Sequence, residues 1–223
     1  MSALFITATG TGIGKTLVTA ALTFQLKQKG HNAIALKPVI SGFEDGGKPN
    51  DTTILAAAAG LDIGPATIER ISPWRFKAPL SPNIAAAREG REIPIEELVA
   101  FCKKTIAGND YTLIEGIGGS HVPLARGYLV ADWIKALEIP ALVVTGSYLG
   151  TLSHTLTTLR ALKADRIPVA GVVVSASREE PMALAETVTA LKDQSPDTKI
   201  FPLKRILEEP LWKHAPDLIR VFE

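Results

Sequence analysis

The fold is decided near the start of the chain by the stretch Ala8-Thr9-Gly10-Thr11-Gly12-Ile13-Gly14-Lys15-Thr16. An apolar, β-branched run precedes it and an amphipathic pattern follows it, so the stretch predicts a glycine-rich turn between a buried strand and a helix. Backbone N–H groups in such a turn, together with the positive end of the helix dipole, point at phosphate oxygens. The lysine can reach the outer phosphates and the threonine a Mg²⁺ ion, so the stretch predicts a nucleotide site.

The loop departs from the strict phosphate-binding motif at one position. That motif places a glycine where this chain has Thr9, and the loop instead fits a variant in which five residues separate Ala8 from Gly14. We expect consecutive residues of the loop and the helix start to contact the nucleotide. They are Gly12, Ile13, Gly14, Lys15, Thr16 and Leu17.

Apolar, β-branched runs continue along the chain, with helical patterns between them. The expected strands cover residues 4–8, 33–36, 112–114, 141–144 and 169–174. Residues 17–26 and 152–162 repeat their apolar side chains at the spacing of one helix face. This alternation predicts an α/β fold with three layers, a mostly parallel sheet flanked by helices, of the P-loop NTPase type. We expect one domain over residues 1–223, with irregular loops at 38–50 and 71–82.

The composition argues against several classes of function. The 223 residues include 24 Lys+Arg and 23 Asp+Glu, a formal net charge of +1, so charge makes no case for nucleic acid or a membrane as partner. The single cysteine, Cys102, cannot form an internal disulfide, and no Cys/His cluster has zinc-ligand spacing. No apolar run approaches the roughly 20 residues that span a bilayer. The single cysteine favours the reducing cytoplasm, and because the N-terminus lacks a basic leader we expect no signal peptide.

Charged residues follow two of the predicted strands, at the edge where ligands bind in open α/β sheets. Lys37 follows the run 33–36, and Glu115 follows 112–114 and precedes Gly116-Ile117-Gly118-Gly119. A carboxylate that ends a buried strand beside glycine-rich backbone favours a role in holding the Mg²⁺ of a bound nucleotide. For Lys37, a solvated strand end and a functional site are equally compatible with the pattern.

Two further features allow more than one interpretation. Asp51 precedes an alanine-rich helical run and is a natural N-cap, a role that does not exclude metal binding. The segment Thr145–His154 follows another buried strand and leads into a helix whose free N–H groups form a second candidate anion site. An ordinary helix start, capped by Ser147 or Thr151, is equally compatible with that segment.

Taken together, the motifs resemble the dethiobiotin synthetase family. The motifs are the phosphate loop, Lys37-Pro38-Val39-Ile40-Ser41-Gly42, Asn50-Asp51, Glu115-Gly116-Ile117-Gly118-Gly119 with Pro123-Leu124, Ala131-Asp132-Trp133, and Leu149-Gly150 with His154. They occur in order between Ala3 and about Val174. The resemblance implies an ATP-dependent ligase of biotin synthesis, a homodimer that joins CO₂, drawn from bicarbonate, to 7,8-diaminononanoate and closes a ureido ring.

The resemblance also implies roles for individual residues. One amine would attack CO₂ to give a carbamate, the carbamate would take the γ-phosphoryl group of ATP, and the second amine would displace phosphate. The implied catalytic residues are Lys37, Lys15, Thr11 and Ser41. The implied Mg²⁺ ligands are Thr16, Asp51 and Glu115, and Glu115 also belongs to the ATP site. The implied substrate contacts are Lys37, Ser41, Gly118, Leu149, Gly150, Thr151 and Ser153, with the helix start at 150–153 reaching the substrate carboxylate across the dimer interface.

The base of the nucleotide is implied to lie against Ser175, Pro202 and Leu203. The family often places an asparagine where this chain has Ser175, and many members carry an acidic residue where it has Gly12. Because serine offers fewer and shorter contacts than asparagine, the base preference stays open.

The main alternative is a partition- or scaffold-type P-loop ATPase, which uses nucleotide to switch a protein partner. Such proteins usually carry a second lysine early in the loop, where this chain has Thr9, Gly10 and Thr11. A guanine-nucleotide switch would need Asn-Lys-x-Asp, and the nearest string, Leu162-Lys163-Ala164-Asp165, lacks the asparagine. The ligase therefore remains the favoured interpretation.

Overall fold

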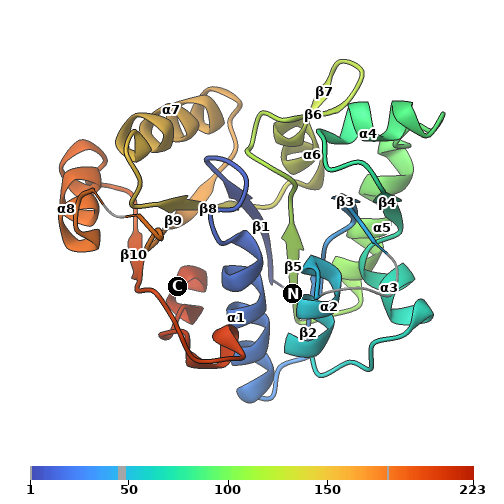
Figure 1. Ribbon diagram of the computed structural model, residues 1–223, viewed down its shortest axis with the longest axis horizontal. Helices are drawn as coiled ribbons and strands as arrows, with labels where there is room; N and C mark the ends of the chain where they lie inside the picture. The colour runs from blue at the N-terminus through green and yellow to red at the C-terminus, as the bar shows by residue number, and fades with distance from the viewer. Residues whose placement is uncertain (1, 45–48, 180) are drawn as a thin grey trace.

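The computed structural model describes residues 2–44, 49–179 and 181–223. Its centre is a six-stranded sheet in which every neighbouring pair is parallel, in the order β10-β9-β8-β1-β5-β2 (Figure 1). The strands are β1 (Ser2–Ala8), β2 (Ala33–Leu36), β5 (Tyr111–Glu115), β8 (Ala141–Gly146), β9 (Val169–Ser175) and β10 (Ile200–Leu203). All five strands expected from the sequence are present, and the predicted α/β fold class is confirmed.

Helices cover both faces of this sheet. They are α1 (Lys15–Gln28), α2 (Asp51–Ala58), α3 (Pro65–Ile71), α4 (Pro82–Arg88), α5 (Ile95–Ala107), α6 (Val130–Leu137), α7 (Thr151–Ala164) and α8 (Leu184–Gln194), with short 3₁₀ helices η1 (Leu211–His214) and η2 (Ile219–Phe222). Successive side chains of a strand point to opposite faces, so β1 contributes to two cores. Leu4 and Ile6 pack with α1 and α2, whereas Phe5 packs with α5 to α8 and meets Trp133 edge to face, with ring centroids 4.8 Å apart.

The two stretches expected to be irregular contain short strands, so that expectation is wrong in part. β3 (Val39–Ser41) pairs in parallel with β4 (Trp74–Phe76), which joins the two stretches beside the main sheet. β6 (Pro123–Ala125) and β7 (Tyr128–Leu129) form a small hairpin. The β3–β4 pairing was missed because three-residue strands are too short for a periodic pattern to show. Part of the first stretch, residues 45–48, lies outside the described residues.

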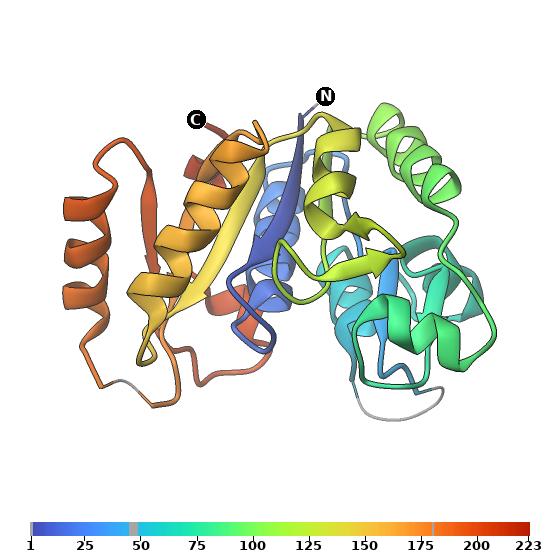
Figure 2. The same ribbon diagram turned by 90° about the horizontal axis from the view of Figure 1, so that it is seen from above.

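The parallel strands bring all their carboxyl ends to one edge of the sheet. In Figure 2 both chain termini lie at one end of the molecule, and the loop that joins β1 to α1 lies at the opposite end. The segments after β1, β2, β5, β8 and β9 therefore meet at a single edge, as Lys37 and Glu115 led us to expect. None of the helices in the described part of the chain has the length and apolar character that crossing a membrane requires.

Candidate active site

The phosphate loop has the backbone conformation that anion binding requires. Gly12 and Gly14 have φ values of 73° and 103°, in the left-handed region that glycine adopts without steric cost. Gly14 is the N-cap of α1 and none of the described side chains caps the helix, so the first turn of α1 presents its N–H groups to the loop. Buried Lys15 donates from Nζ to the Gly10 carbonyl at 3.1 Å, which holds the ammonium group over the loop.

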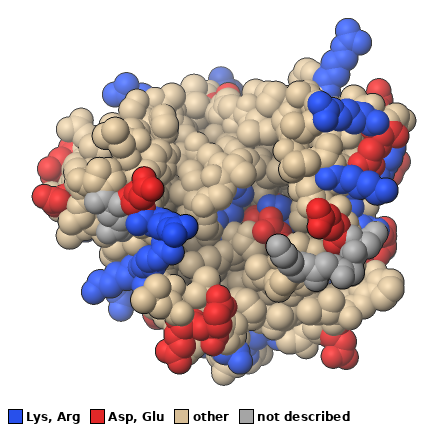
Figure 3. All heavy atoms as spheres, viewed as in Figure 1, with Lys and Arg blue, Asp and Glu red and all other residues tan. Residues whose placement is uncertain are grey.

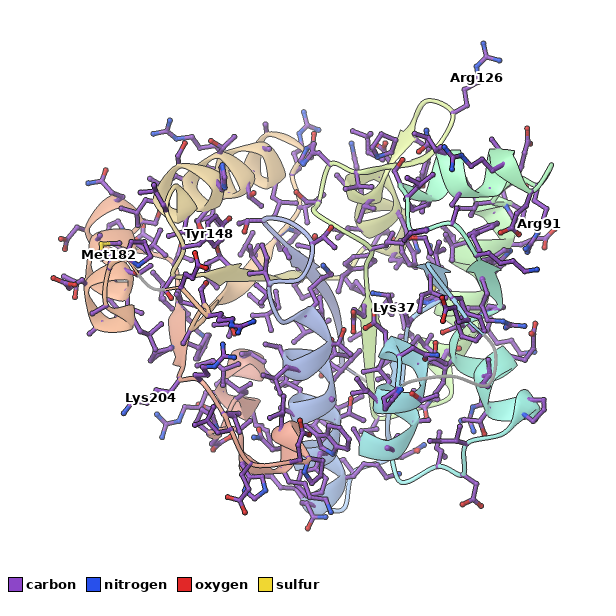
Figure 4. The ribbon with its side chains drawn as sticks, viewed as in Figure 1. Lys37, Arg91, Arg126, Tyr148, Met182 and Lys204 are labelled. Atoms are coloured by element: carbon purple, nitrogen blue, oxygen red, sulfur yellow. The ribbon has the colours of Figure 1, made fainter. Side chains whose placement is uncertain are left out.

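A cluster of charged side chains adjoins the loop on the side of β5 and β2. Lys37 Nζ lies 2.6 Å from Glu115 Oε1 and 2.9 Å from Asp51 Oδ2, and donates to the Gly116 carbonyl at 3.0 Å. Thr16 Oγ1 lies 2.9 Å from Asp51 Oδ1 and 2.9 Å from Glu115 Oε1. Figure 3 shows atoms of basic and acidic residues at the bottom of a hollow near the centre of this face, and Figure 4 places Lys37 in the same part of the view.

Burial and charge shift the pKa values in this cluster in opposite directions. Burial and the charge of Lys37 lower the pKa of Lys15 to about 8, although Glu115 and Asp51 favour its charged form. Burial also acts to lower the pKa of Lys37, but the carboxylates of Glu115 and Asp51 outweigh it and raise that pKa above the ordinary value. For Asp51, burial acts to raise the pKa, and the contacts with Lys37 and Thr16 bring it below the ordinary range. Lys37 and Asp51 are therefore charged at neutral pH.

The same cluster fits a Mg²⁺ ion. Glu115 Oε2 is buried and has no hydrogen-bond partner among the residues that the structure describes, which leaves one oxygen of this carboxylate available as a ligand. Two carboxylates and a hydroxyl are the oxygen ligands that Mg²⁺ takes beside nucleotide phosphates, with water completing the octahedron. The described residues contain no group of three His, Cys, Asp or Glu side chains that could enclose a metal by themselves. Thr16, Asp51 and Glu115 thus suit a metal whose remaining ligands come from phosphate and water.

Asp51 is not the N-cap of α2, so that prediction is wrong. Asn50 is the cap, because its backbone is extended and its side chain accepts a hydrogen bond from the Thr53 N–H at 3.1 Å. The Thr53 hydroxyl in return accepts from the Asn50 N–H at 2.9 Å. Asp51 is the first helical residue, and its carboxylate turns to Lys37 and Thr16 instead.

The glycine-rich segment after β5 packs directly against the phosphate loop. A Cβ atom on Gly119 would lie 3.2 Å from the Ala8 carbonyl oxygen, and one on Gly118 would lie 3.6 Å from Thr11 Oγ1. Gly118 also has a φ of 62°. Gly118, expected to contact substrate, and Thr11, expected to take part in catalysis, are therefore neighbours. Ser41 is the last residue of β3.

The three residues expected beside the base come together at the ends of β9 and β10. Leu203 lies opposite Ser175 in the sheet register and Pro202 lies opposite Val174, and the Ala176 N–H donates to the Leu203 carbonyl at 2.8 Å. A Cβ atom on Gly14 would lie 3.1 Å from Ser175 Oγ. The strand ends therefore adjoin the phosphate loop at the distance of direct contact.

The N-cap of α7 is neither of the two residues, Ser147 and Thr151, that the sequence suggested. Neither Ser147 nor Thr151 caps the helix, because Gly150, with a φ of 93°, is the N-cap. The hydroxyl of buried Thr151 donates to the Gly146 carbonyl at 2.6 Å, so this side chain is committed inside the protein. Leu149 is 87% exposed, and Gly150 and Ser153 are exposed too.

Sequence reasoning placed Tyr148 and Thr145 in a candidate anion site but missed their contacts with the phosphate loop. Both lie within hydrogen-bond distance of Thr9, at 3.1 Å between the oxygen atoms in each case. The one available signal was Thr9 itself, a side chain with a hydroxyl at a position where the strict motif has glycine.

Comparisons with known proteins agree with this geometry. A family model described as an AAA domain matches residues 2–207. The ATP-dependent dethiobiotin synthetase of Methylobacterium nodulans is 46% identical over 188 residues, which cover 81% of this chain and 84% of that protein. The ATP-dependent dethiobiotin synthetase of Acidiphilium cryptum is 44% identical over 194 residues, 86% of this chain and 87% of that protein.

Solved structures with a similar fold include a ParA family ATPase and McdA. A ParA family ATPase from Chlorobium tepidum matches with a TM-score of 0.55 at 13% identity, over 95% of this chain and 87% of that one. The structure of apo McdA from Cyanthece matches with a TM-score of 0.57 at 17% identity, over 96% and 88% of the two chains. At such identities the likeness concerns the fold alone.

The sheet order and the loop between β1 and α1 define a P-loop nucleotide-binding protein. Within that class, the relatives at 44–46% identity decide the assignment. The chain belongs to the ATP-dependent dethiobiotin synthetase family, so the resemblance seen in the sequence is confirmed.

Proposed function

We propose that the protein uses ATP to convert 7,8-diaminononanoate and CO₂ to dethiobiotin, with ADP and phosphate as the other products. The observation that carries this proposal is the convergence of Lys15, Lys37, Thr16, Asp51 and Glu115 beside the phosphate loop. Such a cluster suits a reaction in which two anions, a carbamate and the γ-phosphate of ATP, must approach each other.

The chemistry needs charge stabilisation rather than a covalent enzyme intermediate. An unprotonated amine of the substrate attacks CO₂ and forms the carbamate, whose oxygen then takes the γ-phosphoryl group. The second amine attacks the carbamate carbon, closes the ureido ring and releases phosphate. Lys15 and Lys37 neutralise the charge that develops between carbamate and phosphate, and Thr11 and Ser41 donate hydrogen bonds to the reacting region.

Mg²⁺ is part of the proposal. Thr16, Asp51 and Glu115 would hold it, and when bound it would neutralise charge on the phosphate oxygens. Support comes from the unpartnered Oε2 of Glu115 and from the two short contacts of Thr16 with the carboxylates.

The remaining contacts follow from the placement of the strand ends. Residues 12–17 hold the phosphates, and Ser175, Pro202 and Leu203 adjoin the base. Lys37, Ser41 and Gly118 face the diamine end of the substrate. The exposed turn at Leu149 and Gly150, with Ser153, receives the substrate carboxylate across the interface of a homodimer, whereas the buried hydroxyl of Thr151 holds the start of α7 in place. We also propose a single domain over residues 1–223, because the sheet takes strands from both halves of the chain. A cytoplasmic location completes the proposal and is supported by the single cysteine.

The test is a direct assay of product. Purified protein is incubated with 7,8-diaminononanoate, bicarbonate, Mg²⁺ and, separately, ATP, CTP and GTP. Dethiobiotin is followed by mass spectrometry and phosphate by a coupled assay. We expect equal amounts of dethiobiotin and phosphate. The rates with the three nucleotides give the base preference that Ser175 leaves open. If phosphate is released at the same rate with and without the diamine and no dethiobiotin forms, the result would instead favour the switch ATPase.

A matched pair of variants tests the lysine that the cluster is built around. Lys37→Met should nearly abolish turnover while ATP binding persists, because the ammonium group acts on the reacting anions rather than on the base. Lys103→Met removes an exposed lysine from α5 and should leave turnover unchanged. Normal turnover in Lys37→Met would exclude Lys37 from the mechanism.

A further inference from the structure

A chain of hydroxyl groups joins the phosphate loop to the start of α7, on the side of the loop opposite Lys37. Thr9 Oγ1 lies 3.1 Å from Thr145 Oγ1 and 3.1 Å from the Tyr148 hydroxyl. Thr145 belongs to β8 and Tyr148 to the turn that follows it. Figure 4 shows Tyr148 and Lys37 on opposite sides of the loop between β1 and α1. The two groups of contacts therefore hold the same loop from its two flanks.

The first part of this network of hydroxyl groups is buried and fully connected. Thr145 Oγ1 lies 3.0 Å from Thr151 Oγ1 and accepts from Thr155 Oγ1 at 2.9 Å. Thr151 donates to the Gly146 carbonyl at 2.6 Å, and Thr155 lies 2.7 Å from the Thr151 carbonyl oxygen. All three threonines are buried. Because a buried hydroxyl left without a partner is costly, this network fixes the first turn of α7 on the end of β8.

The second part runs through the side chain of Tyr148. Its hydroxyl lies between Thr9 Oγ1 and His154 Nδ1, 3.0 Å from the latter, and the two rings are 5.7 Å apart. A Cβ atom on Gly146 would lie 2.8 Å from Tyr148 Cδ1 and 2.6 Å from Ser177 Oγ, so the ring reaches this position only because residue 146 is glycine. Tyr148 thus bridges the loop to α7, and it immediately precedes the exposed Leu149–Gly150 turn in the sequence.

We propose that Tyr148 and His154 are positioning residues that couple the phosphate loop to the Leu149–Gly150 turn, so that nucleotide and diamine bind cooperatively. This proposal rests on the proposed function, which assigns the substrate carboxylate to that turn. A nucleotide that orders the loop also orders Thr9, and through the Tyr148 hydroxyl it orders the turn before the diamine arrives. The second ligand then meets a turn that the Tyr148 hydroxyl already holds in position, which makes its binding tighter.

The experiment measures the coupling between the two ligands by calorimetry. The dissociation constant of 7,8-diaminononanoate is determined with and without a non-hydrolysable ATP analogue and Mg²⁺, in the wild type and in Tyr148→Phe. We expect the analogue to tighten diamine binding by about fivefold or more in the wild type, a typical coupling. In Tyr148→Phe this ratio should fall close to one, while the affinity for each ligand alone and the thermal midpoint stay near the wild-type values. Thr9 keeps its contact with Thr145 in this variant, so no hydroxyl is left unpaired.

Three further variants separate positioning from a general structural role. Tyr111→Phe makes the same chemical change at the first residue of β5, at the opposite edge of the sheet, and should keep the wild-type ratio. His154→Ala should lose the coupling, and His154→Asn should retain most of it because its side-chain amide can reach the tyrosine hydroxyl.

The outcomes distinguish this proposal from the proposed function. A wild-type ratio in both Tyr148→Phe and His154→Ala would overturn the positioning role. A loss of affinity for each ligand alone, together with a lower thermal midpoint, would also overturn it. If the wild type makes dethiobiotin but the ATP analogue leaves its affinity for the diamine unchanged, the coupling is refuted and the proposed activity is not. A wild type that neither binds the diamine nor makes dethiobiotin refutes both.

Discussion

Replacement of Lys37 by methionine would leave two carboxylates together without the cation that now bridges them. The Lys37 side chain is 4% exposed and that of Glu115 is 0% exposed, so their 2.6 Å contact is a buried ion pair. Removal of one partner from such a pair costs about 3–5 kcal/mol, because the other charge stays buried. Asp51 is 37% exposed and contributes less, about 1 kcal/mol or below. For a chain of this size the expected loss corresponds to a fall of roughly 6–20 °C in the thermal midpoint.

The assay for this prediction is urea unfolding of nucleotide-free protein, with and without excess Mg²⁺. The free energy of unfolding of Lys37→Met should be lower than that of the wild type by about 3–5 kcal/mol, because removal of the lysine leaves the Glu115 carboxylate buried without its ion-pair partner. Mg²⁺ should also stabilise Lys37→Met more than it stabilises the wild type, since the lysine no longer competes for the carboxylates.

The double variant Lys37→Met/Glu115→Gln provides the control. It removes both buried charges, so most of the lost stability should return, while the effect of Mg²⁺ should disappear and turnover should stay low. An unchanged free energy of unfolding in Lys37→Met, or equal stabilisation of all three proteins by Mg²⁺, would refute the reasoning.

Three other predictions concern the nucleotide, the metal and the assembly. Because the pKa of Lys15 is lowered to about 8, ATP affinity measured by calorimetry should fall as the pH rises from about 7 to about 9, and Lys15→Arg should abolish that dependence. Asp51→Asn should raise the Mg²⁺ concentration needed for half-maximal activity with little loss of stability, whereas Asn50→Ala should lower stability by about 1 kcal/mol and leave the Mg²⁺ requirement unchanged. If subunits share the substrate site, mixing Lys15→Ala with Gly150→Asp protein should restore part of the activity that each lacks, and no recovery would indicate self-contained subunits.

The local pattern of the chain was enough to predict the phosphate loop and five strands of the described six-stranded sheet, all except β10. The strands were recognisable because each is a short β-branched run buried on both faces, and the loop because glycines, Lys15 and Thr16 stand between a strand and a helix. Lys37 and Glu115 could be placed at one edge because parallel strands align their carboxyl ends. The short β3–β4 pair could not be predicted, since three residues carry no periodicity.

Tertiary structure alone decided which side chains touch. Asp51 is adjacent to a better cap, Asn50, and only the packing of α2 against α1 shows that its carboxylate turns to Thr16 and Lys37. In the same way, Thr9 and Tyr148 are 139 positions apart and meet because β1 and β8 are neighbours in the sheet. Periodicity and turn chemistry act over a few residues and are written in the sequence, whereas contacts between strand ends depend on strand order, which no local pattern contains.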